Sequence, residues 1–171
     1  MRALIALTLF LPLATSLACK KKPTETAVID APLPSTKAVT PQQQVMEEVR
    51  ENFRRVNFAF DSSALDAGSK DLLAQNARLM SSHPGISLEV QGHCDERGTT
   101  DYNLALGQRR AKAVRDYMTN AGVSPTRIKT ISMGEERPLV AADGETAWAQ
   151  NRRAEFRVYE GGDGKVVGTV Q

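Results

Sequence analysis

Cysteine, histidine and aromatic residues are scarce in this chain of 171 residues. Two cysteines cannot build a framework of several disulfides, and two histidines leave few ligands for a transition-metal cluster. Aromatic residues make up 5% of the chain, and the net charge is +2. Nucleic-acid binding normally depends on a strong positive charge and on aromatic rings that stack with bases. The composition therefore argues against a nucleic-acid partner and against a metal centre.

An apolar stretch at residues 3–17 follows Arg2 and ends just before Cys19. It is shorter than the ~20 apolar residues that cross a bilayer, and the residue before the cysteine, Ala18, is small. We predict that residues 1–18 are a lipoprotein signal peptide and that Cys19 carries the lipid, which would anchor the mature protein without spanning the membrane. The alternative is ordinary signal-peptide cleavage after Ala18, which would leave a free thiol.

The rest of the chain divides into a tether, a domain and a tail. Residues 19–41 are rich in lysine, proline, threonine and alanine and have no hydrophobic period, which is typical of a flexible tether. Residues 42–160 carry the periodic apolar patterns of a folded domain. The glycine-rich run at 161–164 begins a predicted flexible C-terminal tail, residues 161–171.

The domain alternates between strand and helix patterns. Alternating apolar residues predict strands at 56–60, 86–92, 128–133 and 153–159. Helical spacing predicts helices at 42–55, from 65 to the stop signal at 83–85, through 103–117 up to Gly122, and over one or two turns at 145–151. The order β-α-β-α-β-(α)-β predicts an α+β fold, a two-layer sandwich with helices on one face of a four-stranded sheet.

The stretch 92–114 carries the candidate site. Asp95 lies in a charged turn, and Arg110 lies on the following helix, on the face that points at the core. That face combines Asn103, Leu106, Arg110, Val114 and Tyr117 at steps of three or four residues. A guanidinium keeps its charge and favours a planar anion, so Asp95 and Arg110 together suit a zwitterion, in which the ammonium binds Asp95 and the carboxylate binds Arg110. The alternative is an internal Asp95–Arg110 salt bridge that only fixes the turn.

Four motifs follow one another in the order of a known family. They are G-H-C-D-E-R-G from Gly92, Y-N-L-A-L-G-Q-R-R-A from Tyr102, G-E-E-R-P from Gly134 and A-W-A-Q-N-R-R-A-E-F from Ala147. Together they resemble the OmpA C-terminal domain family, in its peptidoglycan-associated lipoprotein branch, over residues 56–159. One departure is Gly107, where many members of the family carry serine.

The resemblance implies a ligand and the residues that bind it. Domains of this family bind the diaminopimelate residue of peptidoglycan without a covalent bond, and their motif positions fall here on Asp95 and Arg110, with Asn103 and Leu106 on the same helix. The family also places the loop after the first strand against the ligand, which adds Phe60 and Asp61. A plain turn is the alternative role for Asp61. The resemblance further implies the strand order 1-4-2-3 in a mixed sheet, and it implies no cofactor or metal.

The resemblance also implies a location and partners. It places the protein at the periplasmic face of the outer membrane, anchored by lipid at Cys19, within the Tol–Pal system that supports envelope integrity and cell division. The implied partners are peptidoglycan, TolB and other Tol–Pal components, and TolB is expected to compete with peptidoglycan. The alternative is a general OmpA-like peptidoglycan-binding lipoprotein without a Tol partner.

Three further questions concern residues near this stretch. A cell-wall hydrolase would need a nucleophile paired with a base, but the adjacent His93 and Cys94 point to opposite faces of a strand, so we predict no enzymatic activity.

One of Arg152 and Arg153 is expected to line the site while the other braces Asp95 or the sheet. Trp148 is expected to pack, with a role as a ligand platform as the alternative.

Overall fold

The computed structural model describes residues 40–160 and the backbone of residues 165–170. The predicted signal peptide, Cys19 and almost all of the predicted tether therefore lie outside the described residues. Within the described part, no helix combines the length and apolar character that crossing a membrane would require.

Three helices of the domain begin at side-chain caps. Thr40 caps α1 (Pro41–Asn52) in a reciprocal capping box with Gln43. Asp66 caps α2 (Ala67–Ser82), and Thr99 caps α3 (Thr100–Asn120), in each case by accepting a hydrogen bond from a backbone N–H of the first turn. A short α4 (Glu145–Asn151) has no side-chain cap. The sequence therefore fixes where each of the three long helices starts.

The strands form a mixed sheet in the order β1-β4-β2-β3. Strands β2 (Ile86–His93) and β3 (Ile128–Gly134) are parallel, whereas β4 (Arg153–Glu160) is antiparallel to β2 and to β1 (Val56–Asn57). This order and the α+β fold class are confirmed. Strand β1 is shorter than the predicted strand at 56–60.

The predicted flexible tail needs a correction. The backbone of Lys165–Val170 forms a further strand, β5, which pairs antiparallel with β4 and makes the sheet five-stranded. Its β-branched residues Val166, Val167, Thr169 and Val170 suit a strand, but the glycine-rich run before it is also typical of a chain end. Pairing with β4 makes this segment a strand and not a free chain end, and the local sequence does not reveal that pairing.

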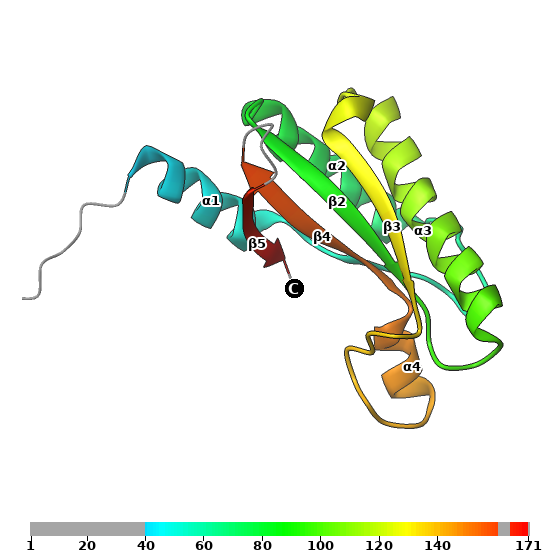
Figure 1. Ribbon diagram of the computed structural model, residues 1–171. Helices are drawn as coiled ribbons and strands as arrows, with labels where there is room; N and C mark the ends of the chain where they lie inside the picture. The colour runs from blue at the N-terminus through cyan, green and yellow to red at the C-terminus, as the bar shows by residue number, and fades with distance from the viewer. Residues whose placement is uncertain (1–39, 161–164, 171) are drawn as a thin grey trace, which may run out of the picture. The chain divides into compact units, whose positions relative to one another are not determined.

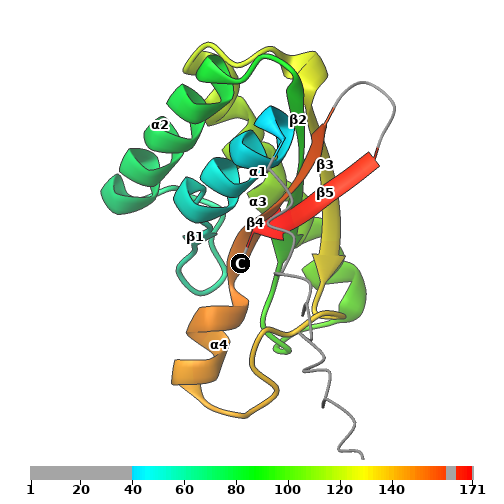
Figure 2. The ribbon, with the colours of Figure 1, turned by 90° about the vertical axis from the view of Figure 1, so that its left-hand side faces the viewer.

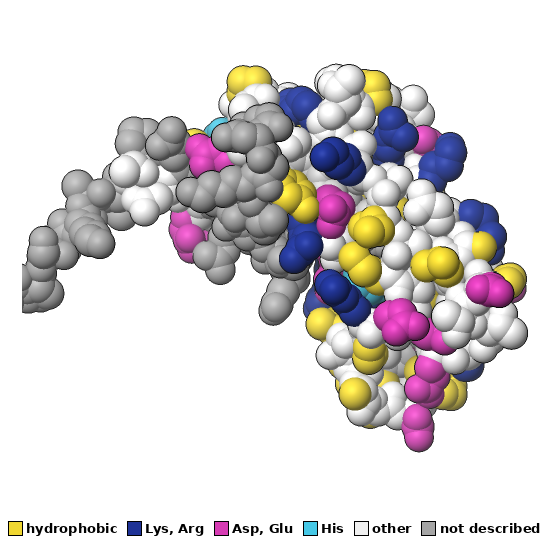
Figure 3. Space-filling view, in the orientation of Figure 1, with side chains coloured by type: hydrophobic (Ala, Val, Ile, Leu, Met, Phe, Trp, Pro, Cys, Tyr) yellow, Lys and Arg dark blue, Asp and Glu magenta, His cyan; other side chains and the backbone are white. Residues whose placement is uncertain are grey.

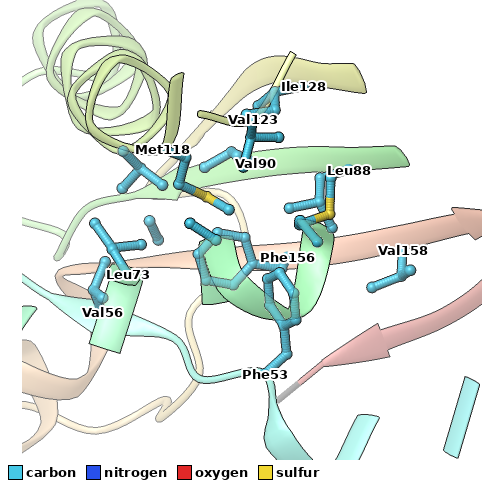
Figure 4. Close-up of a cluster of buried hydrophobic side chains, with 14 of the residues drawn as sticks. Phe53, Val56, Leu73, Leu88, Val90, Met118, Val123, Ile128, Phe156 and Val158 are labelled. Carbon is cyan, nitrogen blue, oxygen red and sulfur yellow. The ribbon is translucent and has the colours of Figure 1, made fainter. Parts of the chain in front are cut away.

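The core lies between the sheet and the helices. Leu88 and Val90 of β2 and Phe156 of β4 point to the same buried side, as their alternation predicts. Phe53, just after α1, meets Phe156 edge to face at 5.1 Å between ring centroids (Figure 4). Figure 2 views the sheet nearly edge-on, with α1, α2 and α3 on one side. The other face, seen in Figure 3, mixes charged and hydrophobic side chains.

Two glycines let α3 lie directly on β2. A Cβ atom at Gly92 would overlap the carbonyl oxygen of Gly107 and lie 2.7 Å from its carbonyl carbon. A Cβ atom at Gly107 would in turn collide with the Ser132 hydroxyl and the Gly92 backbone. Glycine at 107 is therefore a packing requirement in this chain. The close approach fixes the separation between the end of β2 and the start of α3, which lie at the same end of the sheet as α4 (Figure 1).

Candidate functional site

A cavity of about 180 Å³ lies where β2 passes into α3. Its lining residues are Phe60, Asp61, Cys94, Asp95, Arg97, Gly98, Tyr102, Asn103, Leu106, Arg110 and Arg152. The structure thus brings together all six residues predicted to contact the ligand. The cavity is smaller than the ~300–1,000 Å³ that a drug-sized ligand occupies, so it fits a small polar head group.

A larger hollow of about 470 Å³ lies at the opposite end of β2, between Pro84 and Tyr159. It contains none of the predicted ligand-binding residues. The arginine that lines it, Arg127, already donates to the carbonyl oxygens of Met80, His83 and Ile86. We therefore assign the candidate functional site to the smaller cavity, which contains the predicted ligand-binding residues.

Arg110 is the most deeply buried residue of the cavity, with 0% relative exposure. Its Nε donates to the Ser62 carbonyl at 2.8 Å, and its Nη2 donates to the Ala59 carbonyl at 3.2 Å. Nη1 donates to the His93 carbonyl at 2.8 Å and to the Cys94 sulfur at 3.3 Å. Four of the five N–H groups of the guanidinium therefore hold the cavity walls together, and one N–H of Nη2 has no such contact.

No carboxylate among the described residues lies within ion-pairing distance of Arg110. Burial lowers the pKa of its guanidinium, but arginine stays charged at any physiological pH. Carbonyl dipoles offset part of this buried charge, and a full negative charge next to it would offset much more. The cavity therefore presents a cation that favours an anionic ligand.

Asp95 pairs with two other arginines. Its Oδ2 lies 2.6 Å from Arg97 Nη2 and 3.1 Å from Arg152 Nη1, while its Oδ1 accepts the backbone N–H of Arg97 at 3.2 Å. Burial alone would raise the pKa of Asp95, but the hydrogen bonds from Arg97 and Arg152 outweigh it and lower the pKa. The alternative of an internal Asp95–Arg110 salt bridge is therefore wrong, and Asp95 is an ionised carboxylate held by different partners.

Asn103 holds the turn in shape. Its side-chain amide donates to the carbonyl oxygens of Asp95 at 3.2 Å and Arg97 at 3.1 Å, and also to the Glu135 carboxylate. Leu106, one helical turn further on, is buried and adds an apolar patch to the cavity wall. Asn103 thus holds the backbone of the turn that carries Asp95, and Leu106 lies in the same cavity wall as Arg110.

Phe60 and Asp61 form the outer rim. The side chain of Phe60 is 58% exposed, an unusual position for a large apolar ring. Asp61 adopts a left-handed backbone conformation with φ of 50° and accepts a hydrogen bond from the Tyr102 hydroxyl, which raises the pKa of Tyr102. Strained backbone of this kind is concentrated at functional sites, and here it turns a second carboxylate towards the cavity mouth.

The sequence analysis missed the role of Arg97. Its guanidinium carbon lies 4.0 Å from the Phe60 ring centroid and 4.2 Å from that of Trp148, so it stacks between the two rings. In the sequence Arg97 only follows Glu96 in a charged turn, and the stack depends on aromatic residues of two distant segments. Trp148 packs here and donates from Nε1 to Glu96 at 3.1 Å.

Arg152, which lies between α4 and β4, and Arg153, the first residue of β4, have separate roles. Arg152 lines the cavity, binds Asp95 and donates to the Phe58 carbonyl at 3.1 Å. Arg153 points away from the cavity and pairs with Glu155 at 2.7 Å on the opposite face of the sheet. The two side chains diverge where the chain leaves α4 and enters β4, so Arg152 is the arginine that lines the cavity.

His93 and Cys94 also lie on opposite sides of the strand end. The closest acidic partner of His93 is Glu155, 3.8 Å away, whereas Cys94 Sγ donates to the Asn103 carbonyl at 3.3 Å. Burial and the charge of Arg153 lower the pKa of His93 to about 4, and burial raises the pKa of the Cys94 thiol. Between residues 40 and 160, no group of three potential ligands is placed to hold a metal ion. This geometry does not provide the thiolate–imidazole pair of a cysteine hydrolase.

A profile of the OmpA family matches residues 57–152, more than half of the chain. The chain belongs to the OmpA family. A "Peptidoglycan-associated lipoprotein" of Brucella melitensis is 41% identical over 155 residues, which cover 90% of each chain. A protein of the same name from Agrobacterium fabrum is 40% identical over 154 residues, which cover 89% of this chain and 84% of the relative.

A solved structure extends the OmpA family comparison to the fold. The crystal structure of the peptidoglycan-associated lipoprotein from Burkholderia pseudomallei is 43% identical and superimposes with a TM-score of 0.61. The match covers 62% of this chain and 90% of that chain. The resemblance inferred from the four motifs is thereby confirmed.

Proposed function

We propose that this protein is a lipid-anchored envelope protein that binds the diaminopimelate residue of peptidoglycan in the cavity around Arg110. The observation that carries the proposal is the fully buried guanidinium of Arg110, which faces the cavity without a carboxylate partner. The names of the close relatives support peptidoglycan as the partner. The role is binding, and no bond is made or broken.

The chemistry of diaminopimelate matches the two kinds of charge in the cavity. Its free end carries an ammonium and a carboxylate on one carbon atom. The remaining N–H of Arg110 Nη2 would donate to the carboxylate, and Asp95 or Asp61 would receive the ammonium. Three guanidiniums and two carboxylates line the cavity, so it favours a ligand with net negative charge, as a stem peptide with several carboxylates has.

Calorimetric titration of the purified protein tests this proposal. A muropeptide with meso-diaminopimelate should bind, and a muropeptide with L-lysine at the same position should bind about tenfold or more weakly. Lysine keeps the ammonium but lacks the second carboxylate, so the Arg110 charge would stay without a partner. Equal affinity for the two muropeptides would contradict the assignment of Arg110 to the ligand carboxylate.

We further propose that the lipid is attached at Cys19, that the anchor lies in the outer membrane and that the protein belongs to the Tol–Pal system. The relatives support a lipid anchor by name. The Tol–Pal assignment and a role in cell division rest on the family resemblance. TolB should co-purify with the protein from detergent-solubilised envelopes, and added muropeptide should reduce its recovery. A protein that retains peptidoglycan without TolB would instead be a general OmpA-like lipoprotein.

A further inference from the structure

Arg97 joins three segments across the mouth of the cavity. It belongs to the connection between β2 and α3, its guanidinium lies on Phe60 from the connection between β1 and α2, and its other side lies on Trp148 of α4. Its Nη1 also lies 3.5 Å from Glu145 of α4. We name the set Phe60, Arg97 and Trp148 the latch.

The latch occupies the carboxylate that a ligand ammonium needs. Asp95 Oδ2 already receives Arg97 and Arg152, and Oδ1 receives a backbone N–H. The Asp95 side chain is only 5% exposed, so a third cation has no open route to it. Two guanidiniums on one carboxylate would also repel any further positive group. An ammonium therefore reaches Asp95 only after one arginine leaves.

Arg97 is the arginine that can leave. Its side chain is 31% exposed, compared with 7% for Arg152. Arg152 is also held by the Phe58 carbonyl and by Glu145 at 2.6 Å, whereas Arg97 Nε is a buried donor without a hydrogen-bond partner. Displacing Arg97 breaks its ion pair with Asp95, its longer ion pair with Glu145 and two ring contacts, and contacts of these kinds are weak at a partly exposed site.

We propose that Arg97 is a built-in occupant of the ammonium subsite, and that the diaminopimelate ammonium replaces its guanidinium on Asp95. This inference rests on the proposed function. The closed latch keeps Asp95 paired while the cavity is empty, and it admits ligands whose ammonium competes with a guanidinium. Once displaced, Arg97 leaves the rings of Phe60 and Trp148 free to cover the ligand.

Trp148 is the only tryptophan of the chain, so its fluorescence reports on the latch alone. In the purified protein without ligand, Arg97→Ala should change the Trp148 emission because the stacked cation is gone. Arg97→Ala keeps the backbone N–H that binds Asp95 Oδ1, so the turn retains that bond. Arg109→Ala removes the same charge from a ring contact with Tyr102 and should leave the emission unchanged.

Titration with the diaminopimelate muropeptide completes the test. The parent protein should bind with a change in Trp148 emission, and Arg97→Ala should bind about fivefold more tightly without that change. Weaker binding by Arg97→Ala would overturn the inference, because it would make Arg97 a ligand contact. An emission change in ligand-free Arg97→Ala, combined with no muropeptide binding by any variant, would support the latch contact and reject the proposed function. Unchanged emission in ligand-free Arg97→Ala would reject the latch even if the muropeptide binds.

Discussion

Arg110→Ala is expected to weaken muropeptide binding by 100-fold or more and to lower the free energy of unfolding by about 3 kcal/mol or more. Binding is lost because the cavity no longer presents a buried cation to the ligand carboxylate. Stability is lost because the carbonyl groups of Ala59, Ser62 and His93 lose their donor and a large side chain leaves a void. Urea denaturation followed by circular dichroism measures the loss of stability, and calorimetric titration at 15 °C measures the loss of binding.

Arg109→Ala is the matched control, since Arg109 is the neighbouring arginine on α3 and is exposed. It should change stability by less than about 0.5 kcal/mol and leave binding within about twofold. A folded Arg110→Ala protein that still binds the muropeptide would contradict the assigned role. The expected loss of stability follows from the complete burial of Arg110 and from its four hydrogen bonds, neither of which the sequence shows.

Gly92→Ala is expected to destabilise the protein by about 3 kcal/mol or more, and to prevent folding if the backbone cannot shift. The added methyl group would overlap the Gly107 carbonyl, so α3 would have to move away from β2. Because Asp95 lies in the turn directly after β2 and Arg110 lies on α3, any population that folds should also bind the muropeptide more weakly. The midpoint of urea denaturation and a calorimetric titration at the same temperature measure both effects.

Gly85→Ala provides the comparison for the glycine substitution. A Cβ atom there meets nothing within 4 Å, so the free energy of unfolding should stay within about 0.5 kcal/mol of the parent value. Similar destabilisation by the two substitutions would mean that loss of glycine flexibility, and not the contact between β2 and α3, explains the result at position 92.

The sequence by itself determined most of the secondary structure, with β5 as the exception, and the side chains of the central strands that meet in the core. Apolar alternation at Leu88 and Val90, and caps such as Thr99, act over a few residues, so local physics decides them. The motifs then supplied the family, and with it the strand order. The family resemblance also implied six ligand-binding residues, and these lie around one cavity.

Only the tertiary structure decided which charges pair. Arg97 and Asp95 are two residues apart, but Arg152 is 57 residues from Asp95, and the carbonyl groups that hold Arg110 come from two different segments. The pairing of β5 with β4 likewise depends on a neighbouring strand. Hydrogen bonds and ion pairs depend on distances of a few ångströms, and the sequence does not specify such distances between segments until packing, such as the contact at Gly92, brings them together.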